Sequence, residues 1–214
     1  MNRKITINPV TRLEGHGKIE IFLDEAGNVE NAYFQVPELR GFETFCIGRK
    51  AEDMPQLTSR ICGVCPVAHH FASTKALDAA FHVDPPSAAK KLRELMYMGY
   101  VIYDHILHFY YLGGPDFVVG PNAPPEKRNI IGVIEKVGLD VGKEVIKHRA
   151  YGQKITELIG GKATHPVCGL PGGISKPLSE ENRIEIGKMA TSSVQFEVYS
   201  EDIPRHRSGK PEVR

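Results

Sequence analysis

The sequence predicts an α+β protein that is mainly α-helical, with a small N-terminal β-hairpin followed by packed long helices. Residues 4–36 hold two strand-like runs around a turn, whereas the chain after residue 66 carries apolar residues at helical spacing. With 214 residues, 41% of them hydrophobic, the chain is long enough to bury a core. We therefore expect one domain over residues 1–202 and a polar, disordered tail over residues 203–214.

The hairpin is predicted from two runs with high strand propensity. Lys18–Leu23 and Asn31–Val36 flank Asp24–Asn28, whose Asp, Gly and Asn residues favour a turn. Two such runs separated by a short polar segment are expected to pair in antiparallel fashion.

Two helices are predicted in the middle of the chain. Pro66–Phe81 has alanines at helical spacing, which indicates a closely packed helix. The next helix is expected to start near Asp84–Ser87 and to end at Gly113–Pro115, because Gly and Pro interrupt helices. A loop is expected over Asp116–Pro125.

Three further helices are predicted towards the C-terminus. Glu126–Ile159 has a helical pattern with a break around Gly138, which predicts two packed helices. Lys162–Pro177 is rich in Gly and Pro and is expected to be a structured loop. Ser179 is expected to cap a last helix that reaches about Tyr199.

Charge and hydropathy exclude several kinds of partner. Lys and Arg total 27 against 26 Asp and Glu, so the net charge of +1 gives no field that would attract nucleic acid or an acidic membrane. The first residues lack the apolar stretch of a signal peptide, and no later run is long enough to span a bilayer. We expect a cytoplasmic protein without a membrane span.

The sequence Cys62-Gly63-Val64-Cys65 is the strongest local signal for chemistry. Two intervening residues allow both thiolates to bind one soft metal ion. Arg60 lies two residues before the first cysteine, and His69 lies one helical turn after the second, on the same face. A cation beside a thiolate pair can stabilise its charge and donate hydrogen bonds to anionic ligands of a metal.

Spacing alone leaves the kind of site open. A structural zinc site, a pair of buried cysteines and a catalytic metal site are all compatible with the C-x-x-C. His165 and Cys168 could supply two further zinc ligands, which would make the chain a binding module held together by zinc.

Several motifs together resemble those of nickel-iron hydrogenase large subunits, in order and in approximate spacing. They are Arg12-Leu13-Glu14-Gly15-His16, Leu39-Arg40-Gly41-Phe42-Glu43, Arg60-Ile61-Cys62-Gly63-Val64-Cys65 with His69, and Gly160-Gly161-Lys162-Ala163-Thr164-His165-Pro166 with Gly172-Gly173. The resemblance covers roughly residues 4–200 and is nearest to the cytoplasmic methyl-viologen-reducing, F420-non-reducing branch. It implies the front half of the large-subunit fold.

The resemblance implies a metal centre that contains nickel and iron. Cys62 corresponds to a terminal nickel ligand and Cys65 to a bridging ligand, two of the four cysteines in the family's site. The iron of that centre carries carbon monoxide and cyanide. Soft thiolates suit both metals.

The same resemblance implies roles for four more side chains. Glu14 matches a proton-relaying glutamate, although a solvated or salt-bridged glutamate is the alternative. Glu43 matches a magnesium ligand, and a pair with Arg40 or Arg49 is the alternative. His69 matches a histidine packed against the iron, or else is a core histidine bonded to backbone. Arg60 matches an arginine close to the cluster, or else forms a salt bridge at a helix end.

The activity implied by the resemblance is the reversible oxidation of hydrogen to protons and electrons. The electrons would pass to an iron-sulfur small subunit, with flavin or heterodisulfide reductase proteins as further partners. Family members carry a second C-x-x-C near their C-terminus, whereas nothing after Cys168 is a cysteine. We therefore expect an apparently truncated large subunit that is inactive by itself.

Three origins stay open for such a chain: a truncated or frameshifted product, a fragment, and a naturally split subunit. The alternative function is an inactive or zinc-stabilised interaction fragment derived from the same fold.

Overall fold

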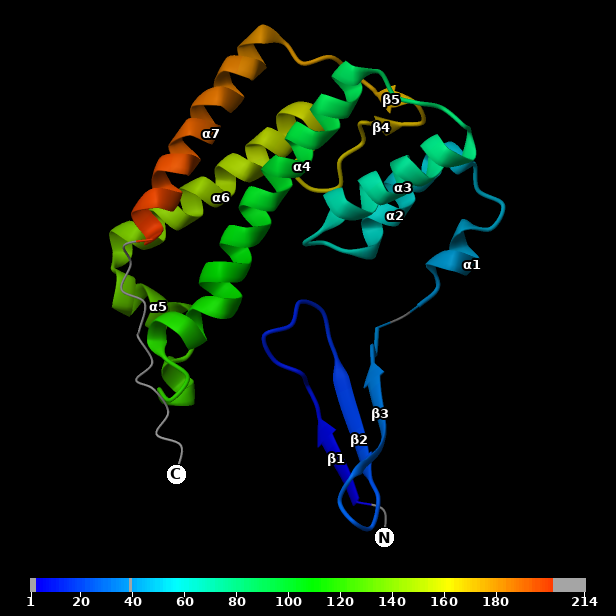
Figure 1. Cartoon of the computed structure of the whole chain (residues 1–214). Helices are drawn as coiled ribbons and strands as arrows, with labels where there is room; N and C mark the ends of the chain where they lie inside the picture. The colour runs from blue at the N-terminus through cyan, green and yellow to red at the C-terminus, as the bar shows by residue number, and fades with distance from the viewer. Residues whose placement is uncertain (1–2, 39, 202–214) are drawn as a thin grey trace. The chain divides into compact units, whose positions relative to one another are not determined.

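The computed structural model describes residues 3–38 and 40–201, and it confirms the predicted fold class: a small N-terminal antiparallel sheet precedes a mainly helical body (Figure 1). Contacts divide the chain into two compact units, one up to Glu43 and one from Thr44 onwards. The single domain expected over residues 1–202 stays a prediction, and the expected tail of residues 203–214 lies outside the described residues.

The first unit is a three-stranded antiparallel sheet with β1 (Arg3–Ile7), β2 (Lys18–Leu23) and β3 (Val29–Gln35) in that order. The predicted hairpin is confirmed as β2 and β3. In its turn, a carboxylate oxygen of Asp24 accepts a hydrogen bond from the Asn28 amide at 2.8 Å. Strand β1 adds to the other side of β2, a pairing that the hairpin pattern does not specify.

Short helices open the second part of the chain. They are α1 (Phe42–Cys46), η1 (Ala51–Asp53), α2 (Met54–Thr58) and η2 (Ser59–Ile61). Each is five residues or fewer, too short to show a helical period in the sequence. The predicted helix after the C-x-x-C follows as α3 (Pro66–Ala80).

The long central helix α4 (Ser87–Leu107) does not end where the glycines predict. Wider π-type turns continue it as η3 (His108–Gly113) and η4 (Pro115–Val119). The prediction that a loop begins at Asp116 was therefore wrong, because the helical winding continues to Val119. Pro115 has no amide hydrogen, which interrupts regular α-helical bonding without stopping the winding of the chain.

The two helices predicted after this segment are confirmed as α5 (Ile130–Val137) and α6 (Leu139–Gly160), with η5 (Pro125–Lys127) before them. They separate at Gly138, whose φ of +89° is accessible to glycine but strained for other residues.

The chain ends, within the described residues, in a small hairpin and a helix. The hairpin consists of β4 (Gly169–Leu170) and β5 (Gly173–Ile174), inside the predicted structured loop. The last helix is α7 (Glu180–Glu201), and the hydroxyl of Ser179 accepts a hydrogen bond from the Asn182 amide at 3.2 Å, as expected of its N-cap.

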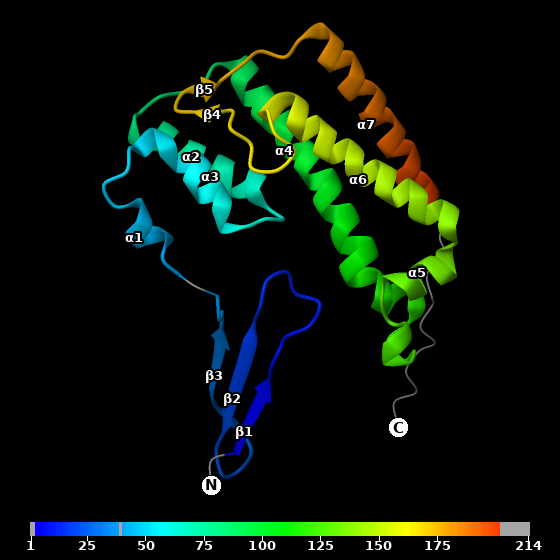
Figure 2. The ribbon, with the colours of Figure 1, turned by 180° about the vertical axis from the view of Figure 1, so that it is seen from behind.

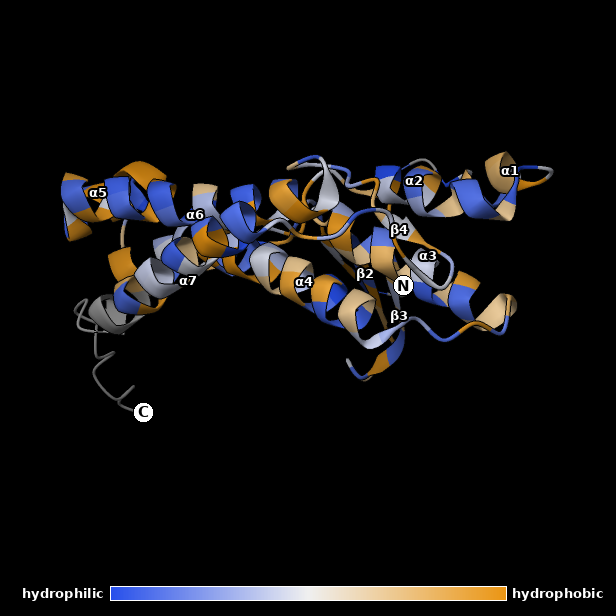
Figure 3. Ribbon diagram, turned by 90° about the horizontal axis from the view of Figure 1, so that it is seen from above, coloured by the Kyte–Doolittle hydropathy of each residue, from blue (hydrophilic) through white to orange (hydrophobic). Residues whose placement is uncertain are grey.

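Helices α4 and α6 lie side by side and form the centre of the second unit (Figures 1 and 2). Glycines bring them close, because a Cβ at Gly152 would lie 2.6 Å from the carbonyl oxygen of Gly99. Hydrophobic and hydrophilic positions alternate along these helices (Figure 3). The main core cluster contains Val67, Phe71, Met96, Tyr100, Tyr103, Ile155, Ile159, Cys168, Ile186 and Met189.

Helix α7 is held on α6 by an aromatic stack around His148. The His148 ring lies parallel to the Phe196 ring at 4.5 Å, and Tyr151 meets it edge-on at 5.3 Å. A ring nitrogen lies 3.2 Å from the hydroxyl of Ser193. His148 is 1% exposed, so the contact between α6 and α7 depends on a buried imidazole.

This stack predicts that the protein loses stability in mild acid. Burial lowers the pKa of His148, with the Lys147 charge acting in the same direction and Glu144 opposing both. Since the folded state favours the neutral ring, stability is lost as pH falls below the ordinary histidine value of about 6.5. We expect the melting temperature to fall between about pH 7.5 and about pH 5.5. His148→Phe, which keeps an aromatic ring, should reduce that fall.

The measurement is thermal unfolding followed by circular dichroism at both pH values. His105→Gln is the control, because His105 is an exposed histidine on α4. If the two variants lost stability equally on acidification, His148 would not be responsible.

Candidate metal centre

Cys62, Cys65 and His69 form one cluster, as their spacing predicts. Their sulfur atoms and one imidazole nitrogen all lie within 4.8 Å of one another, and each residue is half-buried. Cys62 follows η2, Cys65 is the N-cap residue of α3, and His69 lies one turn into that helix. Pro66 occupies the first helical position, where its missing amide hydrogen is not needed.

Two backbone amides point at the Cys62 sulfur. The amides of Val64 and Cys65 donate hydrogen bonds to it at 3.4 and 3.2 Å. The backbone turn between the cysteines therefore supplies two hydrogen-bond donors to this sulfur, and these do not prevent it from also binding a metal. A thiolate held in this way is prepared to bind a soft or borderline cation.

Two tyrosines of α4, Tyr100 and Tyr103, belong to the core cluster against which Cys65 packs. Burial raises the pKa of both phenols, and the charges of Asp104 and Cys65 act in the same direction. Both phenols therefore stay neutral around pH 7. No sequence pattern indicates this neighbourhood, because Tyr103 is far from Cys65 along the chain and its spacing is typical of a core helix.

His70 holds α3 in place through both of its ring nitrogens. Its Nδ1–H donates to the Pro55 carbonyl at 2.8 Å, and its Nε2 accepts from the Gly169 amide at 2.8 Å. These partners define a neutral ring, and burial lowers the pKa of His70 accordingly. A Cβ at position 169 would lie 2.7 Å from His70 Nε2, so glycine is required there. His70 therefore connects α3 with α2 and β4.

The zinc set that combines the two cysteines with His165 and Cys168 is not formed. His165 Nδ1 lies 3.0 Å from the Ser59 carbonyl oxygen, and Cys168 is 1% exposed with its thiol against the Met96 sulfur. Burial raises the pKa of the Cys168 thiol to about 11. In the described part of the chain, neither residue joins a group of metal donors. Cys168 belongs to the hydrophobic core, since it lies among apolar side chains.

Arg60 and Glu14 are placed but not assigned a role by the structure. Arg60 is an exposed residue of η2, two residues before Cys62. Glu14 is an exposed residue of the loop between β1 and β2, in the first unit. His16 of the same loop pairs with Glu38. The proton-relay role of Glu14 stays a prediction.

Glu43 forms the ion pair that was the alternative to magnesium binding. Arg40 contacts the Glu43 carboxylate at 2.6 Å, and this hydrogen bond lowers the pKa of Glu43. Both side chains are well exposed, so the pair adds little stability. The magnesium role of Glu43 stays a prediction.

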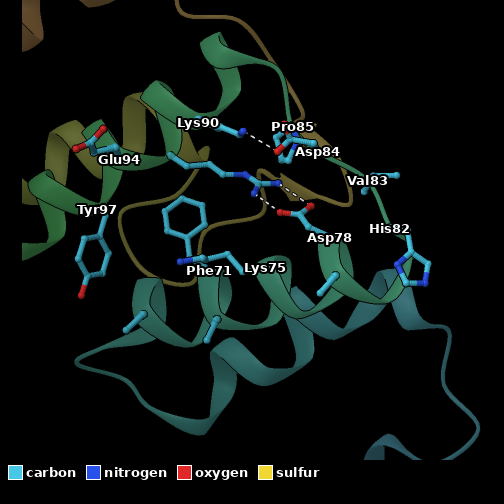
Figure 4. A pocket seen from close by; sticks show the side chains of 14 residues that line it. Phe71, Lys75, Asp78, His82, Val83, Asp84, Pro85, Lys90, Glu94 and Tyr97 are labelled. Atoms are coloured by element: carbon cyan, nitrogen blue, oxygen red, sulfur yellow. Dashed lines mark hydrogen bonds and ion pairs between the residues drawn. The ribbon is translucent and has the colours of Figure 1, made fainter.

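A groove of about 1110 Å³ lies between α3 and α4 (Figure 4). It carries no cysteine. The less exposed of the two ion pairs that line it joins Asp78 and Arg93, with nitrogen and oxygen 2.5 Å apart. Arg93 also donates to the carbonyls of Leu170 and Gly173, at 2.8 and 2.7 Å. Asp78 and Arg93 therefore join α3 and α4 to the β4–β5 hairpin.

Fold and site together define a mainly helical protein with a candidate metal-binding cluster of two cysteines and one histidine at the start of a helix. Comparison with family models identifies its kind. Residues 40–126 match the model described as Nickel-dependent hydrogenase, and residues 4–39 match one described as HoxL-like. Residues 40–126 are thus similar to nickel-dependent hydrogenases, as the motifs predicted, and the fold matches the front half of solved hydrogenase large subunits.

Curated relatives agree with this assignment. The chain is 54% identical over 193 residues to a subunit of the vhu F420-non-reducing hydrogenase of Methanocaldococcus jannaschii, a match that covers 90% of this chain and 46% of the relative. It is 37% identical over 213 residues to the NAD-reducing hydrogenase HoxS subunit beta of Cupriavidus necator, covering 94% and 43%. The chain thus spans less than half the length of these relatives.

Solved structures give the same result. A NAD+-reducing [NiFe]-hydrogenase in the H2-reduced state matches with a TM-score of 0.81 and 39% identity, over 92% of this chain and 44% of that one. The Ni-Fe-Se hydrogenase of D. vulgaris Hildenborough matches with a TM-score of 0.74 and 33% identity, over 95% and 43%. Within residues 3–38 and 40–201, none of the helices combines the length and apolar content needed to cross a membrane.

Proposed function

We propose that this chain is part of the catalytic large subunit of a nickel-iron hydrogenase, which oxidises hydrogen reversibly to protons and electrons. The observation that carries the proposal is the cluster of Cys62, Cys65 and His69 in a chain that matches nickel-dependent hydrogenases. The donor chemistry fits, because two thiolates at the start of a helix suit nickel and iron.

Cys62 and Cys65 would hold two of the four thiolate positions of a nickel-iron centre that carries carbon monoxide and cyanide. When bound, that centre supplies the redox chemistry that splits hydrogen. The amides of Val64 and Cys65 hold the Cys62 sulfur in place. Arg60 would place a positive charge near the anionic ligands. The other two thiolates must come from polypeptide beyond these residues.

The residues proposed to transfer protons and to bind magnesium, Glu14 and Glu43, both lie in the first unit of the chain. Glu14 is proposed to move protons away from the cysteines, because a carboxylate can both accept and release a proton. It is exposed in the loop between β1 and β2. Glu43 is proposed to bind magnesium, which would require the Arg40 contact to open.

The proposed partner is an iron-sulfur small subunit that receives the electrons. Flavin or heterodisulfide reductase proteins are proposed as further partners. The relatives named F420-non-reducing hydrogenase support this branch of the family. A cytoplasmic location is part of the same proposal.

The decisive experiment is anaerobic purification of the chain from its native host with any bound partners, followed by elemental analysis and infrared spectroscopy. Nickel and iron together with carbon monoxide and cyanide bands are expected, along with hydrogen-dependent dye reduction. A preparation with zinc alone or with no metal would contradict the proposal and favour an inactive fragment of the same fold.

A further inference from the structure

Arg149 of α6 has no acceptor for its guanidinium group. Its Nε is buried, and within residues 3–38 and 40–201 no hydrogen bond or ion pair involves this side chain. The acidic residues of α6 pair with lysines of the same helix: Asp140 with Lys143, Glu144 with Lys147, and Glu157 with Lys154. Since buried donors in folded proteins are nearly always bonded, Arg149 indicates an acceptor that the described residues do not supply.

A second arginine shows what is missing at Arg149. Arg128 also has a buried Nε, and the Asp116 carboxylate lies 3.6 Å from its Nη1 and balances its charge. In the described part of the chain, no carboxylate does the same for Arg149. What Arg149 lacks is therefore an anion as well as a hydrogen-bond acceptor.

Arg149 lies at the edge of the contact between α4 and α6. Gly152, one turn after it, is so close to α4 that a Cβ there would lie 2.8 Å from the Tyr103 amide nitrogen. The positive charge of Arg149 acts to lower the pKa of Tyr103, although burial raises it overall. His148 instead faces the Phe196 ring of α7, and adjacent helix residues point about 100° apart. Arg149 therefore lies on the α4 flank of α6, away from the aromatic stack.

Asp104 of α4 is a carboxylate of this chain that acts on the same phenol. Its charge and that of Arg149 shift the pKa of Tyr103 in opposite directions, yet no ion pair joins the two among the described residues. Both side chains are half-buried. Asp104 is therefore the acceptor within this chain that an experiment has to exclude.

A carboxylate is the anion that fits this site. A guanidinium group presents two parallel N–H donors, from Nε and one Nη, which match two carboxylate oxygens. One carboxylate also balances the single positive charge of a half-buried arginine, whereas a phosphate dianion would leave negative charge in excess. The relatives have polypeptide that could carry this group, because the chain spans less than half of their length.

We propose that Arg149 binds the carboxylate of an acidic side chain on a polypeptide segment that covers the α4 flank of α6 and lies outside residues 1–214. The expected bond is bidentate, with Nε and one Nη of Arg149 donating to the two carboxylate oxygens. The proposal rests on the proposed function in one respect, which is that further polypeptide completes the subunit. It does not involve the cysteines, the metal or hydrogen.

The test compares the accessibility of Arg149 in two preparations. One is the native protein, purified from its host with all polypeptide that belongs to it, and the other is the 214-residue chain alone. Each is treated with phenylglyoxal, which modifies arginine side chains. Mass spectrometry measures the modification relative to Arg183, which is already paired with Glu180 on α7. We expect Arg149 to react at least about tenfold more slowly in the native protein, because a buried bidentate pair shields its guanidinium group.

Arg149→Lys keeps the positive charge and removes the two parallel donors. In the native protein it should raise the unfolding rate at least about tenfold, as expected for a lost hydrogen bond to a charged group, and in the isolated chain it should have little effect. Arg183→Lys is the matched control, because its partner Glu180 lies on the same helix and its side chain is 65% exposed. Its unfolding rate should change by less than about twofold in both preparations.

Four outcomes would overturn the proposal. Arg149 could react at the same rate in both preparations, or Arg149→Lys could destabilise the isolated chain as much as the native protein. Asp104→Asn could restore the reactivity of Arg149 in the native protein, which would make Asp104 the acceptor. Exhaustive dialysis could restore it as well, which would make the acceptor a free anion.

The two proposals fail separately. Native protein that contains nickel and iron with carbon monoxide and cyanide bands, but has a reactive Arg149, would refute only this inference. Native protein with a protected Arg149 and no such bands would refute only the proposed function.

Discussion

Cys62→Ser in the native, partner-bound enzyme is expected to abolish hydrogen-dependent dye reduction and to remove the nickel. The physical reason is the change of donor from a soft, polarisable thiolate to a hydroxyl that stays protonated near neutral pH. The hydrogen bonds from Val64 and Cys65 are also directed at a sulfur atom. Hydrogen uptake and the nickel content of the same preparation are the measurements.

Cys46→Ser is the matched control for this prediction. Cys46 is a half-buried cysteine of α1 that takes no part in the donor cluster. We expect its activity and nickel content to stay near those of the parent enzyme. A Cys62→Ser enzyme that still oxidised hydrogen would refute the assignment of Cys62 as a nickel ligand.

The second large effect is a loss of folding stability when the ion pair between Asp78 and Arg93 is broken. Arg93→Met is expected to lower the free energy of unfolding by about 3–5 kcal/mol, because it leaves the Asp78 carboxylate, which is only 13% exposed, without its cation. The Leu170 and Gly173 carbonyls lose their donor as well. Burial acts to raise the pKa of Asp78, yet the contacts with Arg93 and the Gly172 amide outweigh it and lower that pKa.

Urea unfolding followed by circular dichroism measures this loss. Arg183→Met is the control, since Arg183 forms a pair of similar geometry with Glu180 on the surface of α7. Its side chain is 65% exposed, against 10% for Arg93, and the expected loss is below about 1 kcal/mol. Equal losses in the two variants would show that the Arg93 network is not what holds the hairpin to α3 and α4.

Features that depend on neighbouring residues could be predicted from the sequence. The turn at Asp24–Asn28, the break at Gly138 and the cap at Ser179 follow from local backbone preferences. The cluster of Cys62, Cys65 and His69 could be predicted for the same reason, because one turn and one helical repeat bring its members together.

Features that depend on distant residues could not be predicted. His70 bonds to Gly169 across 99 positions, and Arg93 bonds to Gly173 across 80. No periodic pattern encodes such contacts, so the sequence indicates no role for His70. The π turns after α4 were missed because glycine and proline signal an end more often than a change of helix type.

The local origin of the donor cluster has a consequence for the order of events during translation. The three donors are complete once residue 69 has been synthesised, and their approach needs only a turn and the start of α3. The contacts that hold α3 form about a hundred residues later, when the Gly169 amide bonds to His70 and the Gly172 amide bonds to Asp78. The nascent chain can therefore bring these three side chains together before the contacts that bury their helix are able to form.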